Sequence, residues 1–266
     1  MEVGIDADIL LYKSAWALES RGYIGYNDKD EPAYFSKFKK DVKDFPRMES
    51  YSSVEVEDLD LVCSIFDGMV GTIIRKTGAT SHKLYVTGKG NFRKELYNDY
   101  KSSRGPKPLL YSTVREYVEW NPNTIVSEGE EADDLLGIAQ CKDVDNHIIA
   151  SIDKDLLMIE GNHYNINSGE MTYVAPKDGL LSFYKQILTG DKVDDIPGIY
   201  GVGPKKADKI LDGIEDEEDL WLTVVNKWCE YAQHDSVLET VIRNARLLWI
   251  RTKEGEIWQP PIQLMK

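Results

Sequence analysis

The chain has 266 residues, of which 42% are hydrophobic, and it carries a formal net charge of −14 at pH 7. This length can bury a large core in one domain or two, and the chain has neither an apolar run near the ~18 residues of a membrane span nor a secretory leader, so a cytoplasmic location is expected. Three separated cysteines, expected as small core side chains, and four scattered histidines favour neither a disulfide framework nor a zinc site, and the net charge taken alone disfavours nucleic acid as a ligand.

In chain order, short strand-like apolar runs alternate with longer segments of helical period. The strand-like runs are 3–5, 83–87, 124–126 and 147–152. The helical segments are 8–20, 57–77, 91–101, 109–119, 131–141 and 178–189. This alternation predicts an α/β fold with a mostly parallel central sheet flanked by helices. Residues 22–38 are expected to form a hairpin that turns at Asn27 and Asp28.

After Gly190 the strand signals stop, and helical segments with short turns continue to about residue 250. We therefore expect an α/β domain over residues 1–189 and a helical subdomain over 190–250 packed on it. Residues 251–266, which end in QPPIQLMK, are expected to form a surface tail.

Acidic residues follow the predicted strands in an unusual density. Asp6 closes the first strand, and eight further acids stand after later ones: Glu128, Glu131, Asp133, Asp134, Asp153, Asp155, Asp191 and Asp194. Because the carboxyl ends of parallel strands meet at one edge of a sheet, these acids are expected to meet there. Hard oxygen donors of this kind favour Mg²⁺ or Mn²⁺ over zinc.

The alternative interpretation is ordinary helix capping. Acids in the first turn of a helix are stabilised by the helix dipole, and Ser127 with Glu130 would form a capping box. A cap needs only one acid, whereas EADD and DKD supply doubled acids after successive strands. The joint pattern therefore favours a metal cluster.

Basic residues are segregated from these acids. Residues 82–108 hold seven lysines and arginines against two acids, a net charge of 7 − 2 = +5, in a chain whose overall charge is negative. Within them FRKELYNDYKSSR places Arg93, Tyr97, Lys101 and Arg104 at spacings of four, four and three, which predicts one face of a helix. The alternative is a solvated amphipathic helix.

The stretch GIYGVGPKKA follows the last acids directly. Gly201 and Gly203 permit a tight turn that leaves amides at a helix start, and Lys205 and Lys206 follow. Such a turn can hold duplex phosphates without reading sequence.

Together EADDLLG, SIDKD, GDKVDDIPGIYGVGPKKA and FRKELYNDYKSSR resemble the 5′-nuclease family, which includes flap endonucleases, the nuclease domain of bacterial DNA polymerase I and bacteriophage 5′ to 3′ exonucleases. The resemblance covers about residues 3–212 and is greatest to the phage enzymes. It implies a PIN-like domain with a helical arch near 90–120, and a subdomain with a helix-hairpin-helix type motif. It further implies a monomeric, metal-dependent 5′ to 3′ exonuclease or flap nuclease of phage DNA metabolism, located in the host cytoplasm.

The resemblance also implies roles for individual residues. The substrate is DNA with a 5′ end or 5′ flap, cut with two Mg²⁺ or Mn²⁺ ions to give 5′ phosphates. The metal ligands are Asp6, Glu131, Asp133, Asp134, Asp153, Asp155, Asp191 and Asp194. Arg93 and Lys101 contact the scissile phosphate, and Tyr100 stacks on a base. The remaining DNA contacts are Arg104, Gly201, Gly203, Lys205 and Lys206, with K⁺ expected at the glycine turn.

One departure from the family pattern concerns the end of the second strand. Relatives carry an aspartate there, whereas this chain has Thr87 and Gly88, so one ligand is missing or replaced. Asp8 is the candidate substitute, although at a helix start it would also serve as a cap. The missing acid leaves open a second function, a catalytically impaired DNA-binding module of the same fold. Asp195 stands where relatives often have asparagine.

Overall fold

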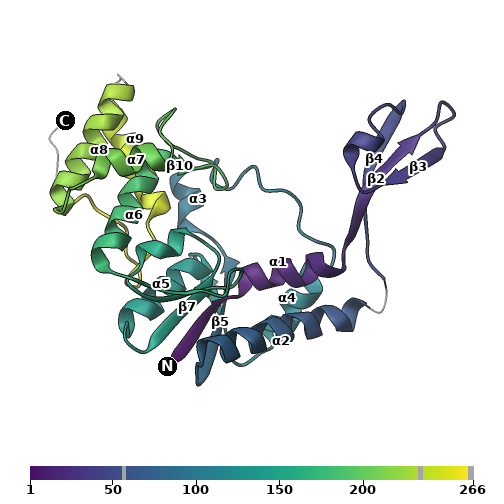
Figure 1. The fold of residues 1–266 in the computed structure, drawn as a ribbon, viewed down its shortest axis with the longest axis horizontal. Coiled ribbons are helices and arrows are strands. Elements are labelled where there is room, and N and C mark those ends of the chain that lie inside the picture. The colour runs from purple at the N-terminus through teal and green to yellow at the C-terminus, as the bar shows by residue number, and fades with distance from the viewer. Residues whose placement is uncertain (56–57, 233–235, 263–266) are drawn as a thin grey trace. The chain divides into compact units, whose positions relative to one another are not determined.

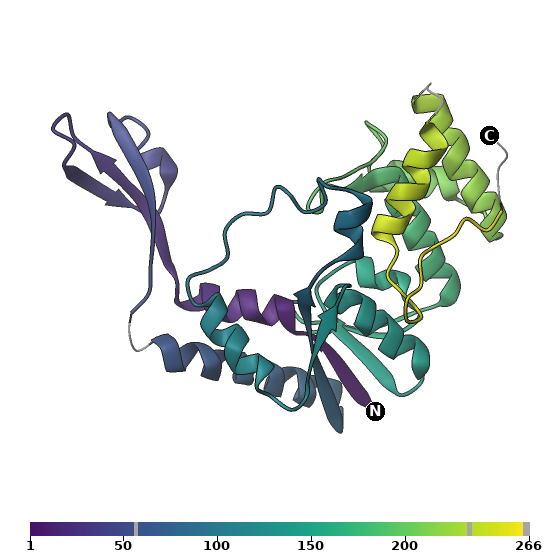
Figure 2. The same ribbon diagram turned by 180° about the vertical axis from the view of Figure 1, so that it is seen from behind.

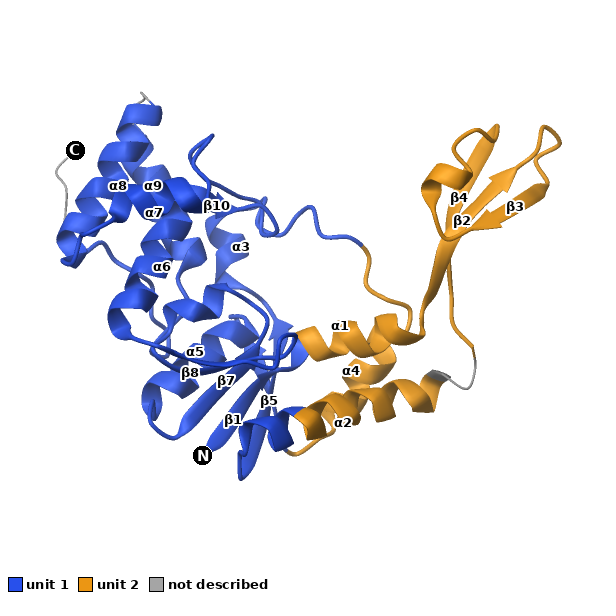
Figure 3. Ribbon diagram, in the orientation of Figure 1, with its two compact units in different colours: residues 1–8, 73–105, 123–266 blue, residues 9–72, 106–122 orange. Residues whose placement is uncertain are grey.

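The computed structural model describes residues 1–55, 58–232 and 236–262 (Figure 1). The chain divides into two compact units (Figure 3). Unit 1 comprises residues 1–8, 73–105 and 123–266, and unit 2 comprises residues 9–72 and 106–122. The boundaries predicted from the sequence, after residues 189 and 250, differ from this division and stay predictions.

Unit 1 is built on a six-stranded sheet with strand order β6-β5-β1-β7-β8-β9. Its strands are β1 (Glu2–Asp6), β5 (Ser81–Lys89), β6 (Thr124–Glu128), β7 (His147–Ser151), β8 (Gly161–Asn165) and β9 (Met171–Val174). Every pairing is parallel except that of β8 with β9. The predicted α/β fold with a mostly parallel sheet is confirmed. The sequence pattern does not predict β8 and β9, because GNHYN is polar and MTYV is a short exposed edge strand.

Helices of unit 1 follow the strands and continue beyond the sheet. They are α3 (Phe92–Leu96), α5 (Ala132–Lys142), η2 (Asp155–Met158), α6 (Pro176–Thr189), α7 (Pro204–Leu211), α8 (Glu217–Tyr231) and α9 (Val237–Leu248). Two short strands, β10 (Gly190–Asp191) and β11 (Ile196–Pro197), pair between α6 and α7. The predicted run of helices after Gly190 is thus present, with this small ribbon inserted.

The C-terminal segment of unit 1 packs on the helices, in contrast to the predicted tail. The Trp258 ring is buried, with its centroid 5.6 Å from that of Phe183 and 5.3 Å from that of Trp221. In both views this yellow segment runs beside the helices (Figures 1 and 2). Burying an aromatic side chain of this size contributes about 4–6 kcal/mol at ~25 cal/mol per Å², which explains why the segment is held. Residues 263–266 lie outside the described part of the chain.

The predicted helix over 91–101 is wrong in its second half. Helix α3 ends at Leu96, because Tyr97 is extended with φ −152° and ψ 111°, and Lys101 lies in the left-handed region with φ 56°. The Lys101 amide donates to the Asp194 carbonyl oxygen at 3.1 Å instead of continuing the helix. The four residues predicted to share a helix face therefore do not. The stretch predicted as a helical arch, 90–120, contains α3 and α4 (Tyr111–Glu119) with turns and extended backbone between them.

Unit 2 combines helices with a separate antiparallel sheet. Its helices are α4, most of α1 (Ala7–Leu18) and most of α2 (Asp58–Thr77). Its sheet has the order β3-β2-β4, with β2 (Ser20–Tyr26), β3 (Pro32–Ser36), β4 (Arg47–Ser53) and the short helix η1 (Lys39–Asp41). The predicted hairpin is confirmed as β2 and β3. The Asn27 side chain holds its turn by accepting from the amides of Lys29 and Glu31 at 2.9 and 3.0 Å.

The cysteines do not occupy the core positions expected of them. Cys141 and Cys229 are exposed and Cys63 is partly buried, because each stands on an outward-facing position of a helix. A cysteine is small enough to be tolerated there. None of the described helices is both long and apolar enough to cross a membrane.

Candidate functional site

Acids from separate strands meet at the carboxyl edge of the unit 1 sheet. Asp6 closes β1, which lies between β5 and β7, and Asp153 follows β7. The Ser151 hydroxyl at the end of β7 donates to Asp6 Oδ2 at 2.7 Å and accepts from the Asp153 amide at 3.0 Å. This hydroxyl, which the sequence analysis did not single out although it opens SIDKD, fixes the two acids relative to each other.

Three acids at this edge have pKa values raised by burial and by one another. Burial, followed by the charges of Asp6 and Asp153, raises the pKa of Asp133 well above its ordinary value. Burial also raises the pKa of Asp153. The pKa of Asp155 rises to about 7 because of burial and the charges of Asp153 and Asp191. In these three, the raised acids, burial and neighbouring carboxylates disfavour ionisation.

Apart from Asp6, the other predicted metal ligands are held by cations. Lys154 Nζ lies 2.9 Å from Asp191 Oδ2. Although burial acts to raise it, this contact keeps the pKa of Asp191 below its usual value. Lys101 Nζ contacts Glu131 Oε1 and lies 3.4 Å from Asp194 Oδ2, and Arg104 donates to Asp194 Oδ1 at 2.9 Å. Burial opposes the lowering, but Lys101 and Arg93 hold the pKa of Glu131 down.

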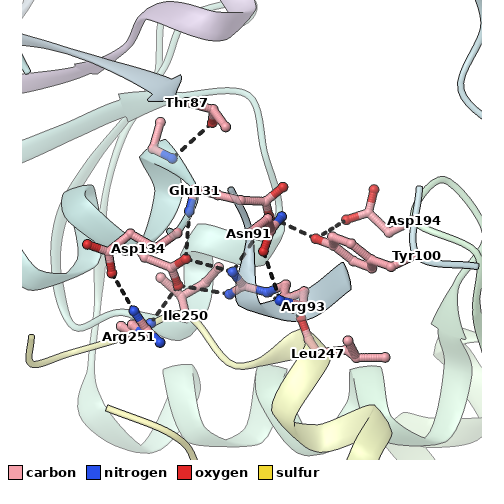
Figure 4. A network of polar contacts seen from close by, with 12 residues as sticks. Thr87, Asn91, Arg93, Tyr100, Glu131, Asp134, Asp194, Leu247, Ile250 and Arg251 are labelled. Atoms are coloured by element: carbon pink, nitrogen blue, oxygen red, sulfur yellow. Dashed lines mark hydrogen bonds and ion pairs between the residues drawn. The ribbon is translucent and has the colours of Figure 1, made fainter. Parts of the chain in front are cut away.

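Asp134 forms the centre of a buried network (Figure 4). Its two oxygens accept from both terminal nitrogens of Arg93 at 2.6 and 2.8 Å, and also from the amides of Glu131 and Arg251 at 3.1 Å each. Burial alone would raise the pKa of Asp134, but the Arg93 charge lowers it. Arg93 completes its hydrogen bonds with the carbonyl oxygens of Leu247 and Trp249.

This network corrects three of the predicted roles. Arg93 is only 1% exposed with its guanidinium fully engaged, so it is not placed to contact a phosphate. Asp134 turns both oxygens to protein donors and joins α5 to the C-terminal segment, which is a structural position. Tyr100 is 2% exposed and its hydroxyl donates to Glu131 at 2.8 Å, so its ring does not offer a stacking face.

The start of α5 is capped differently from the prediction. The capping box joins Glu131 to Asp134, with Glu131 as the N-cap residue. Ser127 instead donates its hydroxyl to the Glu130 carbonyl oxygen at 2.6 Å and accepts from the Gly88 amide at 3.0 Å. Two of the acids in EADD therefore have a structural task, and the remaining one, Asp133, is left facing the other raised acids.

The end of β5, where the family resemblance leads us to expect an aspartate, cannot accommodate one at Gly88. A Cβ at Gly88 would lie 1.9 Å from the Ser127 carbonyl oxygen. The neighbouring Thr87 uses its hydroxyl to accept from the Ala132 amide at 3.0 Å. Asp8 reaches the same place, since its Oδ2 accepts from the Thr87 amide at 3.1 Å while its Oδ1 is buried without a hydrogen-bond partner.

The last acidic motif and the basic segment lie against each other. Besides the contacts of Lys101 and Arg104 with Asp194, the Asp195 carboxylate accepts from the Ser103 amide at 2.9 Å. Asp195 has φ 58°, a conformation that asparagine and aspartate adopt more readily than most residues. The two segments, about ninety positions apart in the chain, therefore form one polar surface in unit 1.

The glycine turn has the conformation that its sequence predicts. Gly201 has φ 75°, and Gly203 is the N-cap of α7, whose first residue is Pro204. Lys205 and Lys206 stand exposed in the first turn of that helix. Backbone amides at the start of a helix, together with the two exposed lysines beside them, favour the binding of anions.

The eight predicted ligands do not form a single cluster. Among residues 1–55, 58–232 and 236–262, no three acidic, histidine or cysteine side chains are gathered so that they could hold an ion as they stand. The reason is the partition described above, in which cations draw Glu131, Asp191 and Asp194 aside. The donors at the edge are nevertheless all carboxylate oxygens, which hard divalent cations prefer, so their chemistry fits such ions.

Comparison with known proteins finds similar sequences among DNA polymerases I and flap endonucleases. No protein-family model matches the chain. DNA polymerase I of Rhizobium leguminosarum is 32% identical over 149 residues, which is 48% of this chain and 14% of that protein. Flap endonuclease Xni of Shewanella amazonensis is 31% identical over 139 residues, 46% of this chain and 54% of that protein. The chain thus spans about half the length of this flap endonuclease.

Among solved structures, the T5 5′-exonuclease with divalent metal ions (zinc) bound superposes with a TM-score of 0.59. The match covers 93% of this chain and 89% of that one, at 14% sequence identity. At this identity the likeness is one of fold. It agrees with the mostly parallel sheet and the helices that follow it in unit 1.

Proposed function

We propose that this chain, which resembles the 5′-nuclease family in sequence and in fold, is a metal-dependent 5′ nuclease that hydrolyses phosphodiester bonds of DNA. The observation that carries the proposal is the group of raised acids Asp133, Asp153 and Asp155 at the carboxyl edge of the sheet. Folding brings them together at an electrostatic cost, because each makes it harder for its neighbours to ionise. Divalent cations would remove that cost.

The residues proposed to hold the ions are the raised acids with Asp6, and, after exchange of their lysine and arginine partners, Glu131, Asp191 and Asp194. Two bound Mg²⁺ or Mn²⁺ ions would supply an activated water and neutralise the phosphate charge. Lys101 lies between Glu131 and Asp194, so once metal ions take these carboxylates its ammonium would be available to the phosphate bound there. Burial acts to lower the pKa of Lys101, but the two acids raise it, which keeps this group charged.

Asp8 is proposed to take the place of the aspartate that relatives carry at the end of β5. Its Oδ2 is fixed by the Thr87 amide, and its buried Oδ1 has no hydrogen-bond partner. A buried carboxylate oxygen without a partner is costly unless a cation or donor satisfies it. Asp8 and Asp6, two positions apart, would then serve the same ion.

The helix start at Gly203 is proposed as the grip on duplex DNA, in a helix-hairpin-helix type motif with room for K⁺ at the turn. Lys205 and Lys206 would contact phosphates without reading bases. A structure-specific 5′ nuclease needs such a grip, because the cut is placed relative to the duplex. Action as a monomer on a 5′ end or flap, with 5′-phosphate products, in phage DNA metabolism, is part of the same proposal.

A catalytically impaired DNA-binding module is the second candidate. One observation favours it, namely that Glu131, Asp191 and Asp194 are paired with protein cations. Such pairs lower the negative charge that a DNA strand would meet. The raised acids favour the nuclease instead, since a cluster of carboxyl groups with no metal to bind would only weaken the binding of a polyanion.

A flap substrate labelled at its 5′ end distinguishes the two candidates. With Mg²⁺ the chain is expected to release a labelled fragment, and EDTA or the variant Asp153→Asn is expected to abolish release. Binding of the substrate without any metal-dependent cleavage would leave the inert module as the function. The matched control Asp145→Asn removes one acid outside the proposed site, and its cleavage rate is expected to equal that of the unchanged chain.

A further inference from the structure

The small sheet of unit 2 exposes aromatic side chains along one strand. Tyr34 and Phe35 on β3 are 47% and 61% exposed, and Phe38, just beyond the strand, is 61% exposed. In both views the three strands stand clear of α1, α2 and α4 of the same unit (Figures 1 and 2). Large exposed aromatics of this kind mark an interaction surface more often than a solvated strand.

The rings on this sheet are held in place by glycines beneath them. A Cβ at Gly22 would lie 2.7 Å from the Tyr51 ring, and one at Gly25 would lie 2.6 Å from the Phe45 ring. These glycines therefore let the two rings lie flat against the backbone. Phe35 meets Tyr51 edge-on at 6.3 Å, and Tyr34 stacks with Phe45 at 6.1 Å. The exposed rings of β3 are thus supported and oriented.

Lysines lie among and just after the exposed rings. Residues 34–43 contain Lys37, Lys39, Lys40 and Lys43 against Asp41 alone, a net charge of 4 − 1 = +3 in a chain of net charge −14. Within the described residues none of these four lysines forms an ion pair. The Lys40 ammonium lies 5.4 Å from the Phe38 ring centroid. We name residues 34–40, with their three rings and three lysines, the β3 strip.

We propose that the β3 strip binds single-stranded DNA, with bases stacked on Phe35 and Phe38 and phosphates paired with Lys37, Lys39 and Lys40. Exposed rings interleaved with cations match a strand whose bases and phosphates alternate. A duplex hides the faces of its bases, so it does not fit the exposed rings. The neighbouring strand β4 is polar and charged, RMESYSS, which does not suit an apolar protein partner. Only the choice of DNA over RNA rests on the proposed nuclease function.

The test is fluorescence anisotropy of a labelled oligothymidylate in EDTA, so that cleavage does not enter. The double variant Phe35→Ser, Phe38→Ser is expected to lose affinity by about tenfold or more, because each stacked base contributes strongly. The triple variant Lys37→Gln, Lys39→Gln, Lys40→Gln is expected to lower the slope of log affinity against log salt by about 2. Both sets of side chains are exposed, so folding is expected to be unchanged.

Matched controls change the same chemistry elsewhere. For the rings, Met171→Ser with Tyr173→Ser removes two exposed apolar side chains from the edge strand β9. For the charges, Gln replaces three exposed lysines of unit 1: Lys142, Lys177 and Lys253. The triple control has the same net charge as the triple variant of the β3 strip. Both controls are expected to bind the oligonucleotide as the unchanged chain does.

Unchanged affinity in the ring variant, or equal losses in variant and control, would overturn the proposal. Tighter binding of oligouridylate than of oligothymidylate would overturn the choice of DNA. A second copy of the chain is the competing occupant, and it would be revealed by a dimer in sedimentation equilibrium that Phe35→Ser, Phe38→Ser dissociates without any change in oligonucleotide affinity. Cleavage of duplex by the same variants, measured with Mg²⁺, tests the nuclease proposal separately, since a strip variant that binds weakly is still expected to cut.

Discussion

Two groups of acids at one sheet edge have opposite electrostatic surroundings. In the first group the pKa values are raised, because the carboxyl groups are buried and lie near other acids; its members are Asp133, Asp153 and Asp155. Glu131, Asp134 and Asp191 are as buried or nearly so, yet lysine and arginine partners lower theirs. We call the second set the paired acids.

The two groups are expected to serve different purposes: the paired acids stabilise the folded chain, and the raised acids bind a ligand. Paired acids contribute to the folded state, because removing one leaves a buried cation without its partner. Raised acids oppose folding, and a chain keeps them only where some ligand uses their charge. Substitutions in the two groups should therefore affect cleavage and stability in opposite ways.

The largest expected effect is a loss of cleavage activity when a raised acid is substituted. Asp153→Asn should reduce the rate of metal-dependent cleavage by about 10³-fold, since an ion ligand contributes several kcal/mol to the transition state. The same variant should unfold at an equal or higher temperature in EDTA, because a mutual repulsion is removed. Single-turnover kinetics and thermal unfolding measure the two effects, and a fall in both activity and unfolding temperature would contradict the comparison.

Substitution of the paired acid Asp134 should instead lower the stability of the folded chain. Asp134→Asn should destabilise the chain by about 3–5 kcal/mol, because the buried Arg93 would lose its bidentate partner and keep only Glu131, at 3.7 Å, as a neighbouring anion. Urea unfolding measures this. The double variant Arg93→Met, Asp134→Leu removes both charges and should recover most of the loss. A double variant no more stable than the single one would show that the ion pair is not the cause.

Substitution of Lys101, which contacts the paired acid Glu131, is expected to affect the cleavage rate. Lys101→Met should lower the cleavage rate by about 10²-fold, as expected for one lost donor to a developing negative charge. Its effect on the substrate dissociation constant should be small, because Lys205 and Lys206 supply the duplex contact. Lys205→Met is the comparison variant, in which weaker binding with little change in rate is expected. Weaker binding in Lys101→Met, or slower cleavage with unchanged binding in Lys205→Met, would contradict the proposed roles of the two lysines.

Asp8 provides a smaller and more specific effect. Asp8→Asn should weaken Mn²⁺ binding by about tenfold, as is usual for the loss of a ligand or its support. Calorimetric titration without DNA measures this independently of cleavage. Asp60→Asn, a change at an exposed acid of α2, is the control. Equal Mn²⁺ affinity in Asp8→Asn and the unchanged chain would leave Asp8 as a cap of the Thr87 amide only.

The smallest expected effect is a dependence of stability on pH. The folded-state pKa of Asp155, about 7, lies above its ordinary value of 3.8, so the metal-free chain should lose stability as pH rises between these values. Mg²⁺ binds the ionised acids, so its stabilisation should be larger at pH 8 than at pH 5.5. Burial lowers the pKa values of His147 and His163, an opposing effect that cancels when unfolding temperatures with and without Mg²⁺ are compared at each pH.

The sequence was informative where the signal was local. The strands that contain Ile5, Leu84 and Ile148 follow from short apolar runs, and their parallel pairing follows from their alternation with helices. The glycine turn before α7 was also predictable, because Gly201 is needed for its positive φ. Over residues 97–101 local pattern and tertiary contact disagreed, since the chain leaves the helix at Tyr97 and the Lys101 amide donates to the Asp194 carbonyl oxygen.

The amino-acid sequence by itself determined the parallel sheet, the placement of acids after its strands and the segregation of basic residues, because period and punctuation act over a few residues. Only the tertiary structure decided which acids are paired. Arg93 lies 41 positions before Asp134, and its partners Leu247 and Trp249 lie much later in the chain. Ion pairing falls off steeply with distance and depends on burial, and neither quantity is written in the spacing of residues along a chain.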